Sequence, residues 1–396
     1  MKIHIHRGQN QIGGSIIEIS TDSTKLIFDV GIELDEAEQI EVPQIDGLFV
    51  GEKKYDAVFV SHYHPDHIGL LGSLVKDIPV YMGEKAFCVL NSAYKYRNLD
   101  VPFNPEYIYD RKAVKIGDIT VTPFLCDHSA FDSYMLIVEA EGKCVLYTGD
   151  FRANGRLDFD RLLNSLPEVD AIIIEGTTLS RDDNIRNIEE EQLEEIAVNY
   201  LEKHGGPAFI MMSAMNIDRL KTIENVAKRT GRLLLEDLYT ARVAVASACA
   251  VPDRKNGVRV FMTKGDSEYD ELCSYGSAKI GKAGIADSQF IMCVRSSMKG
   301  YLERLNELMS FENGVLFYGM WKGYMEQPYM KDFIEFMQSK GVKLHILHTS
   351  GHADSMTIDR FIQKIKPKII IPVHTENAEW FERYGDIVQK SKEIYV

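Results

Sequence analysis

The sequence predicts an α/β protein in which β-rich segments at both ends flank an α/β unit in the middle. Alternating apolar and polar residues in KIHIHR, GSIIEIS and KLIFDVG indicate short strands separated by turn residues. From about residue 180 the residue pattern changes to one that predicts alternating strands and amphipathic helices. From about residue 343 it again predicts short apolar strands. A dense strand meander interrupted by helices favours packed sheets with helices outside them.

The first region, residues 1–180, is expected to hold most of the strands. YDAVFVSH is an apolar run typical of a buried strand, and IGLLGSLVKD after it has the apolar spacing of a helix. Four further strands are expected, each with Gly or Asp at its ends, in AVKIGDITVTPFLC, SYMLIVEA, KCVLYTGDF and DAIIIEGT.

The middle region, residues 181–342, is predicted to form a separate α/β domain. It opens with a long amphipathic helix in RNIEEEQLEEIAVNYLEKHGG, closed by glycines. A second helix is expected in NIDRLKTIENVAKRTG, and strands in PAFIMMSA, RLLLED, SQFIMCV and NGVLFYGM. In the last region, residues 343–396, strands are expected in KLHILHTSGH and PKIIIPVHT, with a helix in SMTIDRFIQKI between them and a final helix after them.

Length and composition limit the class of protein. A chain of 396 residues that is 45% apolar suits two globular domains and excludes collagen-like and low-complexity proteins. A net charge of −14 excludes nucleic-acid binding through bulk positive charge. A local cationic groove, or metal ions that reverse the sign of charge at one site, stays possible.

The cysteines and the N-terminus predict a cytoplasmic protein. The six cysteines are scattered without a close CxxC pair, which is typical of buried thiols in a reducing compartment. MKIHIHRGQNQIGG lacks the apolar core of a signal peptide, and no run approaches the about 20 apolar residues of a membrane helix. We therefore expect no membrane partner.

The placement of the 11 histidines carries the main functional signal. SHYHPDH, which follows a predicted buried strand, holds His62, His64, Asp66 and His67. In an extended segment residues 62 and 64 point the same way, so both imidazoles can meet one cation. At the turn into a helix, Asp66 and His67 can face a second cation.

Other metal-competent groups end predicted apolar strands. These are His128 after VTPFLCD, Asp150 after KCVLYTG and His374 after PKIIIPV. A single strand-end histidine is more commonly a hydrogen-bonded core or surface residue, but the whole set of imidazoles and carboxylates suits two borderline cations, zinc or manganese. The pattern therefore predicts a metal site.

At this point the sequence resembles the metallo-β-lactamase superfamily. SHYHPDH is similar to its HxHxDH signature, and GQNQIGGSIIEIS and LIFDVG resemble its first strands. The resemblance implies an αββα sandwich and two divalent metal ions. One ion would be held by His62, His64 and His128, and the other by Asp66, His67 and His374, with Asp150 between them. Asp29 would either support a ligand or simply form a turn.

The long interval between Asp150 and His374 resembles that of the β-CASP nucleases, which include ribonuclease J. Such an interval is too long for a loop within a compact domain and indicates an inserted domain. IIIEGT, HTSGHAD and PVHT resemble three further motifs of that subfamily and place Glu175, His352 and His374. FIMMSAMNIDRL, with Asn216 and Arg219, resembles the start of the inserted domain.

The resemblance implies a two-metal phosphodiesterase acting on RNA, preferably single-stranded. Asp66, His352 and Glu175 would be catalytic: His352 would protonate the leaving oxygen or hold the phosphate, and Glu175 would orient it. The expected phosphate-binding residues are Ser350, His352 and Arg219. Simpler interpretations are a helix cap for His352, a solvated strand-end carboxylate for Glu175 and a surface position for Arg219, with Asn216 only a helix N-cap.

The chain also departs from ribonuclease J. CVRSSMKGYLERL, with Arg295, stands where relatives usually carry a glycine-rich segment that helps to bind a 5′ phosphate. Because the sequence stops soon after His374, the additional C-terminal domain of ribonuclease J is not expected. A homo-oligomer is an open expectation.

Two other functions are compatible with the sequence. A metallohydrolase of a small ester, lactone or cyclic nucleotide, with the insertion as a lid, agrees better with the acidic charge. A non-catalytic RNA-binding or scaffold subunit ranks below both, because the complete ligand set and His352 are present.

Overall fold

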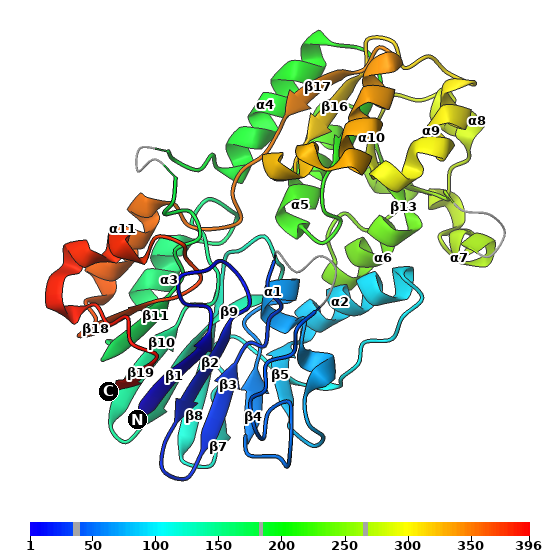
Figure 1. Cartoon of the computed structure of the whole chain (residues 1–396). Helices are drawn as coiled ribbons and strands as arrows, with labels where there is room; N and C mark the ends of the chain where they lie inside the picture. Colours follow the sequence, from blue (N-terminus) through cyan, green and yellow to red (C-terminus); the bar gives the residue numbers. More distant parts are fainter. Residues whose placement is uncertain (35–39, 182–184, 264–267) are drawn as a thin grey trace. The chain divides into compact units, whose positions relative to one another are not determined.

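The computed structural model describes residues 1–34, 40–181, 185–263 and 268–396. The chain forms two compact units, shown in Figure 1. The first unit comprises residues 1–94, 99–187 and 351–396, and the second comprises residues 95–98 and 188–350. The first unit is therefore discontinuous in sequence. It extends to residue 187 and resumes at residue 351, whereas the sequence pattern placed these boundaries at 180 and 342.

The first unit contains two mixed β-sheets. One has seven strands in the order β19-β1-β2-β3-β4-β5-β6. Its strands are β1 (Lys2–Arg7), β2 (Ile16–Ser20), β3 (Lys25–Phe28), β4 (Ala57–Phe59), β5 (Val80–Gly83), β6 (Pro105–Ile108) and β19 (Glu393–Tyr395). The other has six strands in the order β18-β11-β10-β9-β8-β7. Its strands are β7 (Val114–Ile116), β8 (Ile119–Cys126), β9 (Ser133–Ala140), β10 (Lys143–Tyr147), β11 (Ala171–Ile174) and β18 (Ile369–Pro372).

Alternating side chains join these sheets into a sandwich. In β1, Ile3 and Ile5 are buried while their neighbours are partly exposed, as expected where one face of a strand meets a core. They belong to one hydrophobic cluster with Val121 of β8, Leu136 of β9 and Ile371 of β18, so the two sheets share a core. This arrangement confirms the predicted packed sheets.

Helices cover the other face of the six-stranded sheet. α3 (Phe159–Ser165) and α11 (Ser355–Ile365) contribute apolar residues to a second cluster with strands of this sheet. Asp354 is the N-cap of α11, since its side chain accepts a hydrogen bond from the Thr357 backbone N–H, and Ile358 lies in the buried face of the helix. Figure 1 shows α11 and α3 beside β18 and β11.

Two helical predictions in the first unit were wrong. The expected helix in IGLLGSLVKD is only α1 (Pro65–Ile68) followed by a 3₁₀ turn, η1 (Leu71–Ser73), because Gly69 ends the first turn. The final helix is a 3₁₀ segment, η7 (Ala378–Ile387), interrupted by Gly385 at φ 70°. The remaining helix of this region, α2 (Glu84–Tyr96), runs from the first unit into residues of the second.

The strand directions bring functional loops to one edge of each sheet. β10, β11 and β18 are mutually parallel, so their carboxyl ends lie at the same edge. β8 is antiparallel to β9, which is antiparallel to β10, so β8 also ends there. In the other sheet β3 and β4 are parallel and end together. Loops at such ends present side chains from a rigid scaffold.

The second unit is built on an all-parallel six-stranded sheet in the order β14-β13-β15-β12-β16-β17. Its strands are β12 (Ala208–Met211), β13 (Leu233–Asp237), β14 (Val258–Phe261), β15 (Phe290–Val294), β16 (Val315–Tyr318) and β17 (Lys343–Ile346). Its helices are α4 (Glu190–Lys203), α5 (Ile217–Arg229), α6 (Leu238–Ser247), α7 (Tyr269–Ser274), α8 (Lys282–Ala286), α9 (Lys299–Asn306) and α10 (Pro328–Ser339). Short 3₁₀ turns are η2 (Arg254–Asn256), η4 (Gly276–Ala278), η5 (Ser296–Met298) and η6 (Lys322–Glu326).

Helices cover both faces of this parallel sheet, as buried parallel strands require. α9 and α10 contribute to the cluster on one face, and α4 and α5 to the cluster on the other. Asn216 caps α5, since its side chain accepts a hydrogen bond from the backbone N–H of Arg219. Among the described residues, no helix is long and apolar enough to cross a membrane.

A buried acid sits in β13 of the second unit. Glu236 is 0% exposed, and neither carboxylate oxygen has a hydrogen-bond partner among the described residues. Burial, with the nearby Asp237 and Glu224 carboxylates, raises the pKa of Glu236 well above its usual value. The carboxyl is therefore neutral in the folded protein at pH values where it ionises in the unfolded chain.

We predict that Glu236→Gln raises the melting temperature at pH 7. In the wild type, the raised folded-state pKa makes stability fall as pH rises above the unfolded pKa of this side chain, whereas Gln is neutral at every pH. The gain should shrink toward acidic pH. Thermal unfolding followed by circular dichroism at pH 5.5 and pH 7 tests this, with Glu303→Gln, an exposed position on α9, as the control. Equal or lower melting temperatures for Glu236→Gln at both pH values would contradict it.

Candidate metal centre

The SHYHPDH segment follows β4 and turns into α1. Ser61, His62 and Tyr63 are buried, and Pro65 occupies the first turn of α1, where its missing N–H costs nothing. His64 is the N-cap and has extended backbone angles. This change from extended to helical backbone sends His62 and His64 one way and leaves Asp66 and His67 buried in the first turn of the helix.

His62, His64 and His128 form the first group. Their ligand-competent atoms all lie within 4.8 Å of one another. His128 Nε2 lies 3.1 Å from His64 Nδ1, and the ring centroids of His62 and His128 are 4.6 Å apart. His128 comes from the loop after β8, so the two sheets of the first unit both contribute to this group.

Asp66, His67 and His374 form the second group, again within 4.8 Å of one another. His374 Nε2 lies 3.1 Å from Asp66 Oδ2, and His67 Nε2 lies 3.9 Å from the same oxygen. His374 has a left-handed backbone, with φ 49°, directly after β18. The two groups are those that the sequence resemblance implied.

Asp150 lies between the groups and contacts both. Its Oδ2 is 3.7 Å from His62 Nε2, 3.9 Å from His128 Nε2 and 3.3 Å from His67 Nε2, and its Oδ1 is 3.8 Å from His374 Nδ1. The carboxylate is 2% exposed. Its position is the one a bridging ligand would need.

The polar atoms of this cluster are suited to divalent cations. His62 Nε2, His67 Nε2 and both Asp150 oxygens are buried, and none has a hydrogen-bond partner among the residues that the structure describes. Such orphaned groups are costly unless another partner satisfies them. Nitrogen and carboxylate donors of this kind are typical ligands of zinc and manganese. The donor set therefore fits metal ions.

Electrostatics keep several imidazoles ready to coordinate. Burial and the neighbouring His67 hold the pKa of His62 well below its usual value, and burial with His64 does the same for the pKa of His128. Burial lowers the pKa of His64 to about 4. Neutral imidazoles present the lone pairs that a metal requires.

Asp29 orients His67 through the ring nitrogen on its other side. The Asp29 carboxylate lies 2.7 Å from His67 Nδ1 and accepts hydrogen bonds from Ser61 N and Oγ, each at 2.7 Å, and from the Tyr147 hydroxyl at 2.6 Å. Asp29 is fully buried and has φ 58° at the end of β3. It therefore both makes the turn and fixes a candidate ligand.

Other candidate ligands are fixed in the same manner. His128 Nδ1 lies 2.6 Å from the Gly351 carbonyl, and His374 Nδ1 lies 2.8 Å from Thr177 Oγ1. His62 Nδ1 lies 3.0 Å from Ser61 Oγ. Partners of this kind set which ring nitrogen faces a metal.

His352 and Glu175 meet beside the cluster. His352 Nδ1 lies 3.2 Å from Glu175 Oε2 and 3.5 Å from Asp150 Oδ2, and its side chain is 23% exposed. Glu175 is fully buried and accepts hydrogen bonds from Phe151 N at 2.9 Å and Thr177 Oγ1 at 2.6 Å. Burial lowers the pKa of His352, but the Glu175 and Asp150 carboxylates outweigh burial and raise this pKa to about 9. Glu175 is thus not a solvated strand-end carboxylate.

The expectation that Arg219 binds phosphate was wrong, because its side chain is buried and cannot reach a phosphate. Its side chain is 0% exposed and forms a paired contact with Glu190, at 3.1 Å for both Nε and Nη2. Its Nη1 also donates to the Leu347 carbonyl at 2.7 Å. Arg219 therefore joins α5, α4 and the end of β17 inside the second unit. Ser350 is buried and is the last residue of that unit.

Arg295 also serves the second unit. Its Nη1 donates to Asp237 Oδ1 at 2.9 Å, and its guanidinium lies about 5 Å from the ring centroids of Tyr96 and Tyr239. These contacts engage the guanidinium of Arg295, which stands where relatives carry the glycine-rich segment.

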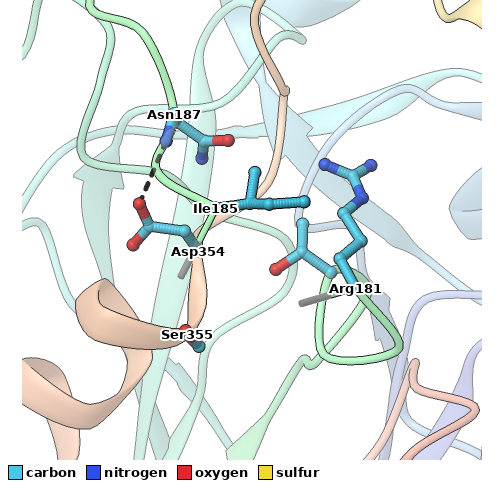
Figure 2. Close-up of a pocket in the computed structure, with 6 residues that line it drawn as sticks. Arg181, Ile185, Asn187, Asp354 and Ser355 are labelled. Atoms are coloured by element: carbon cyan, nitrogen blue, oxygen red, sulfur yellow. Dashed lines mark hydrogen bonds between the residues drawn. The ribbon is translucent and has the colours of Figure 1, made fainter. Parts of the chain in front are cut away.

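A small hollow near the start of α11 lies outside the cluster (Figure 2). Asn187 borders it, donating its backbone N–H to Asp354 Oδ2 at 3.1 Å and its side-chain amide to the His352 carbonyl at 2.8 Å. The hollow is lined by Thr178, Arg181, Ile185, Asn187, Asp354 and Ser355. It contains none of the candidate ligands.

Several supporting residues were not predicted from the sequence. Ser61, Tyr147 and Thr177 hold Asp29, Glu175 or a histidine in place. Arg152, two residues after Asp150, donates from Nε to Asp127 Oδ1 at 2.6 Å. Their closeness in sequence to the motifs is the only signal that could have indicated them. Which functional group each side chain contacts depends on strands far apart in the chain.

Comparisons with known proteins agree with this geometry. Residues 11–191 match the metallo-β-lactamase superfamily, and residues 341–396 match the Zn-dependent metallo-hydrolase RNA specificity domain. An RNase J-like protein of Methanocaldococcus jannaschii is 24% identical, over 95% of this chain and 93% of the relative. Ribonuclease J of Sinorhizobium meliloti is 21% identical, over 85% of this chain and 60% of the relative. Ribonuclease J 2 of Streptococcus pyogenes is 22% identical, over 93% of this chain and 68% of the relative.

A solved structure shares the fold. A protein of unknown function from Enterococcus faecalis superposes with a TM-score of 0.82 at 19% identity, covering 100% of this chain and 99% of that one. The sheet sandwich, the two histidine and aspartate groups and the match over residues 11–191 support a protein with the metallo-β-lactamase fold. Within that class it is a ribonuclease J-like protein, as the sequence resemblance implied.

We predict that Asp29→Asn weakens metal binding by about 10- to 100-fold, because the amide loses the charge that holds His67 Nδ1. Titration of the metal-stripped protein with Zn²⁺ measures this change. Asp22→Asn, on an exposed turn, is the matched control. An affinity equal to the wild type in a folded Asp29→Asn protein would show that Asp29 serves only the turn.

Proposed function

We propose that the protein is a metal-dependent ribonuclease that hydrolyses phosphodiester bonds of RNA. The observation that carries the proposal is the convergence of two ligand groups on the buried Asp150 carboxylate, whose oxygens lack hydrogen-bond partners among the described residues. The similarity to proteins named ribonuclease J and the match to an RNA specificity domain support RNA as the substrate.

The proposed centre holds two cations, most suitably zinc, with manganese as the alternative. His62, His64 and His128 would hold one, and Asp66, His67 and His374 the other, with Asp150 shared. When bound, cations in such sites activate water and neutralise the charge of a phosphate. The chain then needs no nucleophilic side chain of its own.

We propose that His352 donates a proton to the leaving oxygen. Its Nδ1 faces Glu175 and Asp150, which favours the protonated ring and makes Nε2 the atom that donates to substrate. Glu175 orients this ring and is itself fixed by Phe151 N and Thr177. Ser350 stays a proposed phosphate contact, because a hydroxyl next to Gly351 suits a phosphate oxygen.

The finer features of the proposal concern substrate and setting. We propose single-stranded RNA, because a buried centre receives an unpaired strand more readily than a duplex. We also propose a cytoplasmic setting and the formation of a homo-oligomer. The net charge of −14 implies that contacts away from the centre are weak and sensitive to salt.

We predict that purified protein supplied with Zn²⁺ or Mn²⁺ cleaves single-stranded RNA and that Asp66→Ala abolishes cleavage through loss of a ligand. His352→Ala should lower kcat by about 10²- to 10⁴-fold, the usual contribution of a general acid, while metal content stays at the wild-type level. RNA labelled at its 5′ or 3′ end measures both rate and product ends. His204→Gln, a histidine on α4's C-cap, is the control.

Two results would contradict the proposal. Metal-loaded protein that leaves RNAs with 5′-monophosphate, 5′-triphosphate and hydroxyl ends intact is not a ribonuclease. Hydrolysis of a cyclic nucleotide or small ester without RNA cleavage would instead identify a small-substrate metallohydrolase.

A further inference from the structure

A second cluster of metal-competent side chains lies on β1, β2 and β19. His4 pairs in register with Glu18 of β2 on one side and with Glu393 of β19 on the other. Paired residues of adjacent strands project from the same face of a sheet, and His6, two residues along β1, projects from that face as well. Because Ile3 and Ile5 face the core, this row faces outward.

The side chains of this row converge. The rings of His4 and His6 have centroids 4.1 Å apart, and His6 Nε2 lies 3.0 Å from Glu18 Oε2. Single ligand atoms of His4, His6 and Glu18 all lie within 4.8 Å of one another. Glu393 Oε1 lies 3.9 Å from His4 Nδ1. Two imidazoles and the Glu18 carboxylate thus converge on one point of the sheet, and the half-exposed Glu393 carboxylate lies beside His4.

The cluster is held in place yet reachable. Glu18 is fixed by hydrogen bonds from Ser20 Oγ and the Tyr55 hydroxyl, each at 3.1 Å. Its side chain is 8% exposed, that of His6 is 13% exposed and that of His4 is 27% exposed. A ligand set fixed by neighbouring hydrogen bonds and open on one side has the features of a site that an ion can enter.

This cluster is separate from the candidate metal centre. The centre is built from loops after the carboxyl ends of β4, β8, β10 and β18, whereas these residues belong to the strands themselves. The two sets share no residue. An ion here would have no route to the proposed chemistry through a common ligand.

We propose that His4, His6 and Glu18 bind one further divalent transition-metal ion of the zinc class, with Glu393 as the fourth ligand. Two nitrogen and two oxygen donors satisfy the four-coordinate preference of zinc. Lys2 lies 2.8 Å from Glu393 and competes with the ion for that carboxylate. The bound ion would link three adjacent strands, including the edge strand β19.

Counting ions per chain tests the proposal on the full-length protein. Metal-stripped wild type and His4→Gln/His6→Gln are dialysed to equilibrium against Zn²⁺, and bound zinc is measured by atomic emission. The double variant should bind one ion fewer than the wild type. Lys2→Gln, on the same face, is the matched control: it should bind as many ions as the wild type and hold this one more tightly, because the competing ammonium is gone.

The same ion count for the wild type and a folded double variant, as judged by circular dichroism, would overturn the proposal. If the double variant does not fold, His4→Gln alone decides, because His4 is the most exposed of the three ligands. It should weaken one class of zinc sites at least tenfold. Unchanged affinity of every class in His4→Gln would leave the His6–Glu18 contact as a hydrogen bond only.

Discussion

The buried carboxylate of Asp150 is the constraint around which the first unit is arranged. An ionised group that is 2% exposed is costly unless positive charge or hydrogen bonds compensate it. Here imidazoles from three segments surround it, and neither of its oxygens has a hydrogen-bond partner among the described residues. Their convergence requires β8, β10 and β18 to run in one direction and β4 to end opposite them. The strand directions in both sheets therefore bring the imidazole nitrogens close to the Asp150 carboxylate.

The local charge at the metal centre, once two cations are bound, would differ in sign from the net charge of the whole chain. The whole chain carries −14, and acidic groups also surround His352, whose ring favours its protonated form between Glu175 and Asp150. Two divalent cations would add four positive charges within this small volume. An acidic protein can thereby attract a phosphate at one place while most of its surface repels it. The acidity seen in the composition limits contacts far from the centre rather than the chemistry within it.

The places of many strands along the chain could be predicted, because they depend on short apolar patterns. The grouping of the candidate ligands was implied by the family resemblance, and these ligands are His62, His64, Asp66, His67, His128, Asp150 and His374. The role of Arg219 could not be predicted, since a helix surface position and a buried pair with Glu190 have the same local sequence. The helix expected after His67 was wrong because Gly69 ends α1, and the position of α1 itself depends on a contact with a distant segment. Gly31 approaches the Asp66 backbone so closely that an added Cβ would lie 1.6 Å from its carbonyl oxygen, and such tertiary packing decides where α1 sits. Tyr147 and Thr177 gained their roles from strands distant in sequence.

The discontinuity of the first unit has a consequence for synthesis on the ribosome. β11 pairs with β18, yet residues 188–350 of the second unit are translated between them. Until β18 emerges, one edge of β11 is open to incorrect pairing, and His374 is missing from its group. If His374 is a ligand, as proposed, the metal centre stays incomplete until this last segment has been translated. A late strand then closes an early sheet and completes the centre in the same step.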